Sequence, residues 1–195
     1  TKDVEDAVLA DPKGAALVDV IDIQYWFYRA DGSLYAPKGG LNLSPRQHAR
    51  QVAPGETSAA QVYRAVKEYR DRYPNKAVIY SAAGAREYPW AVLIAGGSLP
   101  VVPQVDDPGF AAAAARMKPV DTASDAYLMA GAEGEGYLVC PLRDGTIGVN
   151  VPKGRYERLV IDAKTGKIVS RKRVNVSGEM AELPMNVGTV VWLKR

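Results

Sequence analysis

The chain has 195 residues, 47% of them hydrophobic and 24% charged, with a net charge of +3 at pH 7. A chain of this composition buries enough apolar surface to fold, which excludes extended disorder. Its densest basic run, Arg171–Arg173, is too short to predict a nucleic-acid-binding surface. No apolar run is long enough to span a membrane. The lone Cys140 has no partner in the chain for a disulfide or a zinc site.

The first half of the chain predicts strands that alternate with helices. Residues 1–10 predict the end of a helix, so we expect the chain to be a piece of a longer protein. The apolar, β-branched run Ala15–Trp26 predicts a strand that is buried on both faces, as in a parallel sheet. A long loop over residues 28–55 follows, and structureless loops of this length are usually functional.

The clearest helix begins at Ser58, which forms a capping box with Gln61. Alternating strands and helices predict parallel strands joined by right-handed crossovers, and three such units form either a small open sheet or part of a larger barrel. The apolar stripe of the helix consists of Val62, Val66, Tyr69 and Tyr73. The later elements of this half are a strand at 76–81, a helix at 84–97, a strand at 98–102 and a helix at 110–117.

The pattern changes near residue 122, where short strands separated by turns begin. Several short strands at this spacing predict an antiparallel β-sandwich. We therefore expect two domains, residues 1–121 and residues 122–195. The predicted strands are Ala126–Ala130, Gly136–Pro141, Thr146–Val149, Tyr156–Asp162, Lys167–Val176, Ala181–Pro184 and Thr189–Leu193.

Four motifs, in this order, carry a resemblance to a known family. They are Val18–Gln24, Arg86–Gly97, the turn Asp162–Gly166 and the closing apolar strand Val190–Leu193. The chain resembles bacterial glycoside hydrolase-like proteins that pair a (β/α)₈ barrel with a C-terminal β-sandwich. Among these proteins, it resembles the apiosidase-like group. That sandwich is often labelled collagen-binding, although the label proves no such binding.

The resemblance implies an α/β plus all-β fold, in which the last three β/α units of a TIM-type barrel precede a small antiparallel β-sandwich. The N-terminal barrel segment would then be the partner that is missing, and the protein would be bacterial and secreted or periplasmic. Retaining barrel glycosidases of this kind carry a nucleophilic Glu at the end of strand seven, and Ala82 stands near that position here. The usual mechanism with two carboxylates therefore does not carry over at this position.

Barrel enzymes hold their active sites at the carboxyl ends of the strands. Gln24, Tyr25 and Trp26 end the first predicted strand, and an amide next to aromatic rings suits a sugar, although barrel packing would explain them equally well. Arg46 and His48 lie in the long loop as further candidates for substrate binding, and ordering of that loop is the alternative role. Because His48 is the only histidine, it cannot belong to a histidine cluster that holds a metal.

A second group of candidates follows the strand at 76–81. Arg86 is a candidate for substrate binding, and Glu87 is the best-placed carboxylate for acid–base catalysis. The alternative for Glu87 is a charge in the first turn of a helix, where the dipole favours it. Of Asp19 and Asp22, at most one points into the barrel because their spacing is odd. No phosphate-binding glycine motif occurs, and no cofactor or metal is expected.

Three hypotheses follow from the sequence. The first is a glycosidase-like protein, here a fragment, that acts on the glycosidic bonds of a polysaccharide or oligosaccharide. The second is a non-catalytic protein of the same fold that binds carbohydrate through Tyr25, Trp26 and His48. The third is a small α/β interaction protein unrelated to sugars. If the first is correct, the sheet of the first half should have unpaired parallel edges or a companion polypeptide that fills them.

Overall fold

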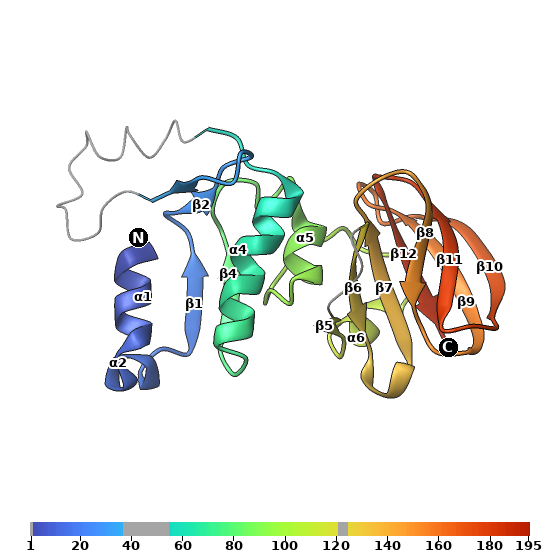
Figure 1. The fold of residues 1–195 in the computed structure, drawn as a ribbon, viewed down its shortest axis with the longest axis horizontal. Helices are drawn as coiled ribbons and strands as arrows, with labels where there is room; N and C mark the ends of the chain where they lie inside the picture. The colour runs from blue at the N-terminus through green and yellow to red at the C-terminus, as the bar shows by residue number, and fades with distance from the viewer. Residues whose placement is uncertain (1, 37–54, 121–124) are drawn as a thin grey trace. The chain divides into compact units, whose positions relative to one another are not determined.

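The computed structural model describes residues 2–36, 55–120 and 125–195 (Figure 1). Two compact units make up the chain, Thr1–Val101 and Val102–Arg195, and we call them the first and the second unit. This division lies before the predicted boundary near residue 122. Residues 118–120 form a strand that pairs within the sheet of the second unit. The domain boundary near residue 122 itself stays a prediction.

The first unit contains a parallel pair of strands, as the alternating pattern predicted (Figure 1). Strands β1 and β4 pair from Val20 opposite Ala77 to Ile23 opposite Tyr80. The described sheets do not close into a barrel. The elements of this unit are α1 (Lys2–Ala10), α2 (Pro12–Ala16), β1 (Val20–Ile23), β2 (Phe27–Tyr28), β3 (Leu34–Tyr35), α4 (Ala59–Arg72), β4 (Ala77–Tyr80) and α5 (Pro89–Ile94).

Helix α4 covers one face of the parallel pair. Its Ser58 N-cap accepts a hydrogen bond from the backbone N–H of Gln61, as the capping box predicted. The predicted stripe is also present, since Val62, Val66 and Tyr69 are fully buried. These side chains share a core with the inward-facing residues of the two strands, which are Ile21, Ile23, Val78 and Tyr80.

The opposite face of β1 and β4 is open within the described part of the chain. Val20 on this face is 49% exposed, and Asp22 two residues later is exposed too. Each of the two strands has only the other as its partner among the described residues. Within the described residues, the outer edge of β1 therefore agrees with the expectation of unpaired parallel edges, whereas on the outer edge of β4 the Val78 backbone bonds to Ser98.

Three predicted elements of the first unit differ from the structure. The strand predicted over Ala15–Trp26 is shorter, because Asp11 caps a short helix, α2, that occupies its first residues. The helix predicted at 84–97 begins only at Pro89, after a turn in which Gly84 has a φ of 85°. The strand predicted at 98–102 does not form, because Leu99 adopts a φ of 58° that is incompatible with extended backbone.

The second unit contains all the strands that the sequence predicted beyond residue 125. A six-stranded antiparallel sheet has the order β10-β9-β12-β7-β6-β5, and β11 and β8 form a second, two-stranded sheet. The elements are α6 (Phe110–Ala114), β5 (Lys118–Val120), β6 (Ala126–Ala130), the 3₁₀ helix η1 (Ala132–Gly134), β7 (Gly136–Pro141), β8 (Gly145–Asn150), β9 (Gly154–Asp162), β10 (Ile168–Val176), β11 (Met180–Met185) and β12 (Thr189–Lys194).

The two sheets of the second unit share one hydrophobic core. Ile147 and Leu183 of the small sheet lie in one cluster with Val139, Tyr156 and Val191 of the large sheet. On its other face the large sheet packs against α6, where the rings of Phe110 and Trp192 meet edge to face at 5.3 Å. The six-stranded sheet is thus covered on both sides over part of its length.

The turn Asp162–Gly166, one of the resemblance motifs, joins β9 to β10. The Asp162 carboxylate accepts hydrogen bonds from the backbone N–H groups of Lys164 and Thr165 and from the Thr165 hydroxyl. Gly166 has a φ of 75°, and a Cβ there would lie 2.1 Å from the carbonyl oxygen of Gln104. The motif is therefore explained by turn geometry and close packing, without a functional role.

Candidate functional site

Two polar side chains meet at the carboxyl ends of the parallel strands, on the open face. The Ser81 hydroxyl follows β4 directly and donates a hydrogen bond of 2.6 Å to Asp22 Oδ1 on β1. Side chains alternate along a strand, so Asp22 shares the open face with Val20, while Ile21 and Ile23 point into the core. Asp22 thus points away from α4.

A groove of about 600 Å³ adjoins this pair after β4. Its lining includes Ser81, Arg86, Glu87, Leu99 and Val101. Arg86 and Glu87 are both exposed, and the sequence had selected both. Leu99 and Val101 are each 77% exposed, so the groove places charged groups next to apolar ones. This combination suits a sugar, whose rings offer hydroxyl edges and apolar faces.

Ala82, which stands near the position expected for the nucleophilic Glu, is among the residues that line this groove. It is only 9% exposed and belongs to the core cluster on the α4 side, together with Tyr80. Ser81, one residue earlier, is the exposed position at the end of β4. The carboxylate at this end comes from the neighbouring strand, as Asp22. Asp22 was not among the residues that the sequence selected, although its alternation with Ile21 and Ile23 was a signal that could have identified it.

The remaining candidate residues differ in their exposure to solvent. Gln24 and Tyr25 follow β1 and are exposed, Tyr25 by 46%. Trp26 is fully buried, which corrects the expectation that it faces a sugar, because its ring fills the core between α1 and α4. Arg46 and His48 lie outside the described residues.

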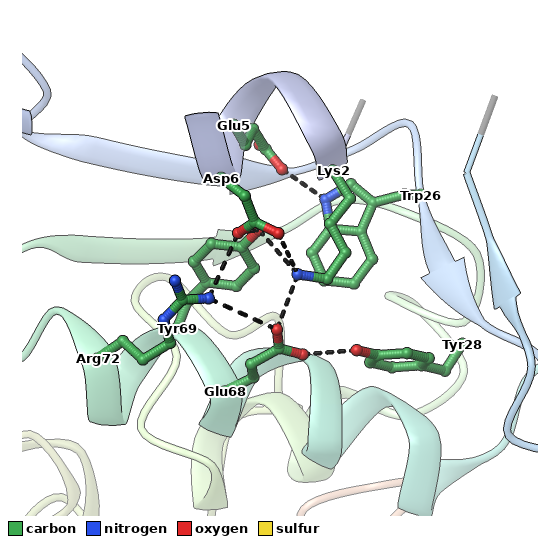
Figure 2. A network of polar contacts seen from close by, with 8 residues as sticks. All are labelled: Lys2, Glu5, Asp6, Trp26, Tyr28, Glu68, Tyr69 and Arg72. Atoms are coloured by element: carbon green, nitrogen blue, oxygen red, sulfur yellow. Dashed lines mark hydrogen bonds and ion pairs between the residues drawn. The ribbon is translucent and has the colours of Figure 1, made fainter. Parts of the chain in front are cut away.

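Trp26 belongs to a network of charged and aromatic side chains that we call the Lys2 network (Figure 2). The Lys2 ammonium lies 2.8 Å from Asp6 and 2.7 Å from Glu68. It also lies 4.9 Å from the ring centroids of both Trp26 and Tyr69. The members are Lys2, Glu5, Asp6, Trp26, Tyr28, Glu68, Tyr69 and Arg72.

The network fixes the segment that follows β1 onto two helices. The Trp26 indole N–H donates a hydrogen bond to the Glu5 carboxylate on α1 (Figure 2). The Tyr28 hydroxyl donates one of 2.6 Å to Glu68 on α4. The Tyr69 hydroxyl on α4 donates one of 2.9 Å back to Asp6 on α1. These contacts hold the residues just after Tyr25 in place and account for the burial of Trp26.

Burial shifts the pKa values within this network. Burial raises the pKa of Glu5 above its usual 4.5; the hydrogen bond from Trp26 opposes this rise, and the charge of Asp22 adds to it. For Lys2, burial alone would lower the pKa, but the hydrogen bonds to Asp6 and Glu68 outweigh it and raise the pKa.

Acidification is expected to weaken the network through Asp6. The pKa of Asp6 is lowered from 3.8: burial would raise it, but the hydrogen bonds from Lys2 and Tyr69 prevail. A carboxyl group of this kind stabilises the fold above its unfolded pKa, and the contribution is lost as the pH falls through its folded pKa. The stability difference between wild type and Asp6→Asn, measured by urea unfolding, should therefore shrink as the pH falls from about 5 to below about 3. For the exposed Asp71→Asn control the difference should stay small throughout, and a difference for Asp6→Asn that is equally flat would contradict the assignment.

The described residues contain neither a candidate metal cluster nor a helix that could cross a membrane. Residues 2–36, 55–120 and 125–195 contain no group of three or more His, Cys, Asp and Glu side chains that could hold a metal ion. Among the same residues, no helix has the length and apolar character that crossing a bilayer requires.

Comparisons with known proteins point to one kind of fold. Residues 1–117 match the family model described as "Domain of unknown function (DUF6298)". One similar solved structure is described as "Glycoside hydrolase"; it is 12% identical, has a TM-score of 0.54, and the match covers 93% of this chain and 54% of that one. Another is a glycoside hydrolase family 5 protein from Bacteroides vulgatus, 11% identical with a TM-score of 0.51, where the match covers 90% and 50%.

These matches bear on the fold alone. The chain spans about half the length of the two solved structures. No curated protein matches it. At this low identity, the chain has mixed α/β content and a fold of the glycoside hydrolase kind.

Proposed function

The chain belongs to the DUF6298 family, and we propose that it is part of a glycosidase-like protein that acts on a polysaccharide or oligosaccharide. One observation carries the proposal. On the open face, the Ser81–Asp22 pair lies at the carboxyl ends of the parallel strands, beside the groove that Arg86 and Glu87 line. In (β/α)₈ barrels this end of the strands holds the active site.

The proposal includes the finer architecture. We interpret β1, β4 and the segment that begins at Ser98 as the last three strand positions of a TIM-type barrel, and the second unit as a β-sandwich. Ser98 still donates a backbone hydrogen bond of 2.6 Å to Val78 of β4, as a neighbouring strand would. The partner that completes the open face would be the N-terminal barrel segment, and the setting would be secreted or periplasmic.

Each residue of the site has a proposed role. Glu87 is the proposed acid–base catalyst, because it is the exposed carboxylate in the groove. Gln24, Tyr25 and Arg86 are proposed to bind the sugar, since all three are exposed after β1 and β4. Arg46 and His48 remain proposed contacts outside the described residues. Glycoside hydrolysis uses two carboxylates on either side of the bond, so a second one must accompany Glu87.

A non-catalytic protein that binds carbohydrate is the second candidate. The observation that favours it is the end of β4, a strand that the structure describes completely. Ser81 and Ala82 stand there, and neither can act as the carboxylate nucleophile of a retaining glycosidase. The groove and the open face would then bind a sugar chain without cleaving it.

The test uses the longest natural polypeptide that contains this chain, screened against neutral and acidic oligosaccharides for binding and for release of reducing ends. If the protein is a glycosidase, Glu87→Gln should lower the rate on the order of 100-fold or more. Glu182→Gln, an exposed change on β11, should leave the rate unchanged. Binding without any cleavage would favour the second candidate, and the absence of both binding and cleavage would overturn both.

A further inference from the structure

The second unit contains a groove of its own, of about 830 Å³, formed by β9, β10 and β12 and the residue that follows β12. Basic side chains dominate it, although the whole chain has a net charge of only +3. The charged and amide groups that line it are Arg155, Glu157, Arg173, Asn175, Lys194 and Arg195.

Strand register places five of these residues on one face of the six-stranded sheet. Arg155 lies opposite Asn175, and Glu157 lies opposite both Arg173 and Lys194. Residues directly opposite each other in antiparallel strands point to the same side. The positions are therefore fixed by the pairing of three strands, which is more rigid than a loop.

The positive charge of the groove is not neutralised from within. The ion pair of Glu157 is with Arg171, at 3.3 Å, and not with the arginines of the groove. Lys194 has a longer contact with Asp107, at 3.6 Å. Arg155 and Arg173 are exposed, and neither has an ion pair among the described residues. Two guanidinium groups are thus free to bind an anion.

Protection of a sheet edge does not explain this arrangement. Lys and Arg side chains often protect edge strands from pairing with other chains. Strand β10, with Arg173, is such an edge, but Arg155 lies on β9 and Lys194 on β12, and both of these strands are internal. A charge that continues across three strands requires another reason.

We propose that this groove binds an acidic polysaccharide, one whose sugar units carry carboxylate or sulfate groups. Arginine suits such a ligand because its planar guanidinium binds an oxyanion through two hydrogen bonds. The Asn175 amide, exposed in the same groove, matches sugar hydroxyls. Single-stranded nucleic acid would need aromatic rings for base stacking, and the aromatic residue of the lining, Tyr156, is only 2% exposed. The choice of a carbohydrate rests on the proposed function.

The test measures binding of the whole chain to polygalacturonate, dextran sulfate, neutral dextran and single-stranded DNA by isothermal titration calorimetry at fixed ionic strength. We expect binding to one or both acidic glycans and none to neutral dextran. Arg155→Gln combined with Arg173→Gln should weaken it at least tenfold. Lys172→Gln should change it less than twofold, because Lys172 lies on the same strand and points to the other face.

Several results would overturn the proposal. They are the absence of binding to both acidic glycans, an equal loss with Lys172→Gln, and DNA binding that is equally tight and equally sensitive to the arginine substitutions. Thermal unfolding of each variant verifies that it is folded. Glu87→Gln should leave the binding of acidic glycans to the second-unit groove intact. A failure of the proposed catalysis and a failure of the proposed binding in this groove therefore give different results.

Discussion

Replacement of Lys2 by methionine is expected to lower the free energy of unfolding of the first unit by about 3 kcal/mol, near the lower limit for removal of one partner from a buried ion pair. The Lys2 side chain is 10% exposed, and its ammonium lies 4.9 Å from the centroids of two aromatic rings. Its removal leaves the carboxylates of Asp6 and Glu68 with only the longer contacts to Arg72, at 3.4 Å and 3.9 Å. Their partial exposure, 33% and 26%, keeps the effect from being larger. Urea unfolding followed by circular dichroism measures it.

Two further variants separate charge from packing. Glu68→Gln added to Lys2→Met should recover part of the loss, because it removes one of the stranded charges. Lys67→Met, which breaks the i,i+4 contact with Asp71 on the same helix, should cost less than about 1 kcal/mol. Equal effects of Lys2→Met and Lys67→Met would show that the Lys2 network stabilises no more than a surface ion pair.

Elements with local signals were predictable from the sequence. The cap at Ser58 and the stripe of Val62, Val66 and Tyr69 both depend on residues within a few positions of each other. The strands beyond residue 125 are bounded by turn residues, and Gly166 with its positive φ is one of them. In each case one short segment contains the whole physical cause, so a pattern in the sequence was sufficient.

Elements that depend on distant contacts were not predictable. Trp26 looked like a sugar contact because it follows a strand, but Glu5 and the α4 side chains around it come from other segments. The Lys2–Glu68 contact joins residues 66 positions apart. Leu99 had the sequence pattern of a strand residue, and no neighbouring residue in the sequence indicated its φ of 58°. Tertiary packing overrode local preference at all of these places.

The candidate site was predictable in part, through a rule about folds rather than through a motif. The rule that barrel sites lie after the strands selected Arg86 and Glu87, and both line the groove after β4. It could not distinguish Tyr25, which is exposed, from its neighbour Trp26, which is buried. It did not select Ser81, whose hydrogen bond to Asp22 joins two strands that are 59 positions apart in the sequence.

Tyr25 and Trp26 therefore allow a decisive comparison between binding and folding. Trp26→Ala should lower the free energy of unfolding by about 3–5 kcal/mol, the cost of emptying a large buried position, which is a major part of the stability of a small unit. Tyr25→Ala should cost less than about 1 kcal/mol, because that ring is 46% exposed, and it should weaken oligosaccharide binding instead.

Trp26→Phe sharpens the comparison, since it keeps a ring in the core while it removes the hydrogen bond to Glu5 and part of the buried volume. It should cost about 1–3 kcal/mol in urea unfolding, because it leaves a half-buried carboxylate without its donor. Oligosaccharide affinity per folded molecule should not change, because the indole contacts the helices and not the groove. Lost affinity with unchanged stability would mean that the Trp26 ring contacts the sugar, and that Trp26 becomes exposed when the protein binds its ligand.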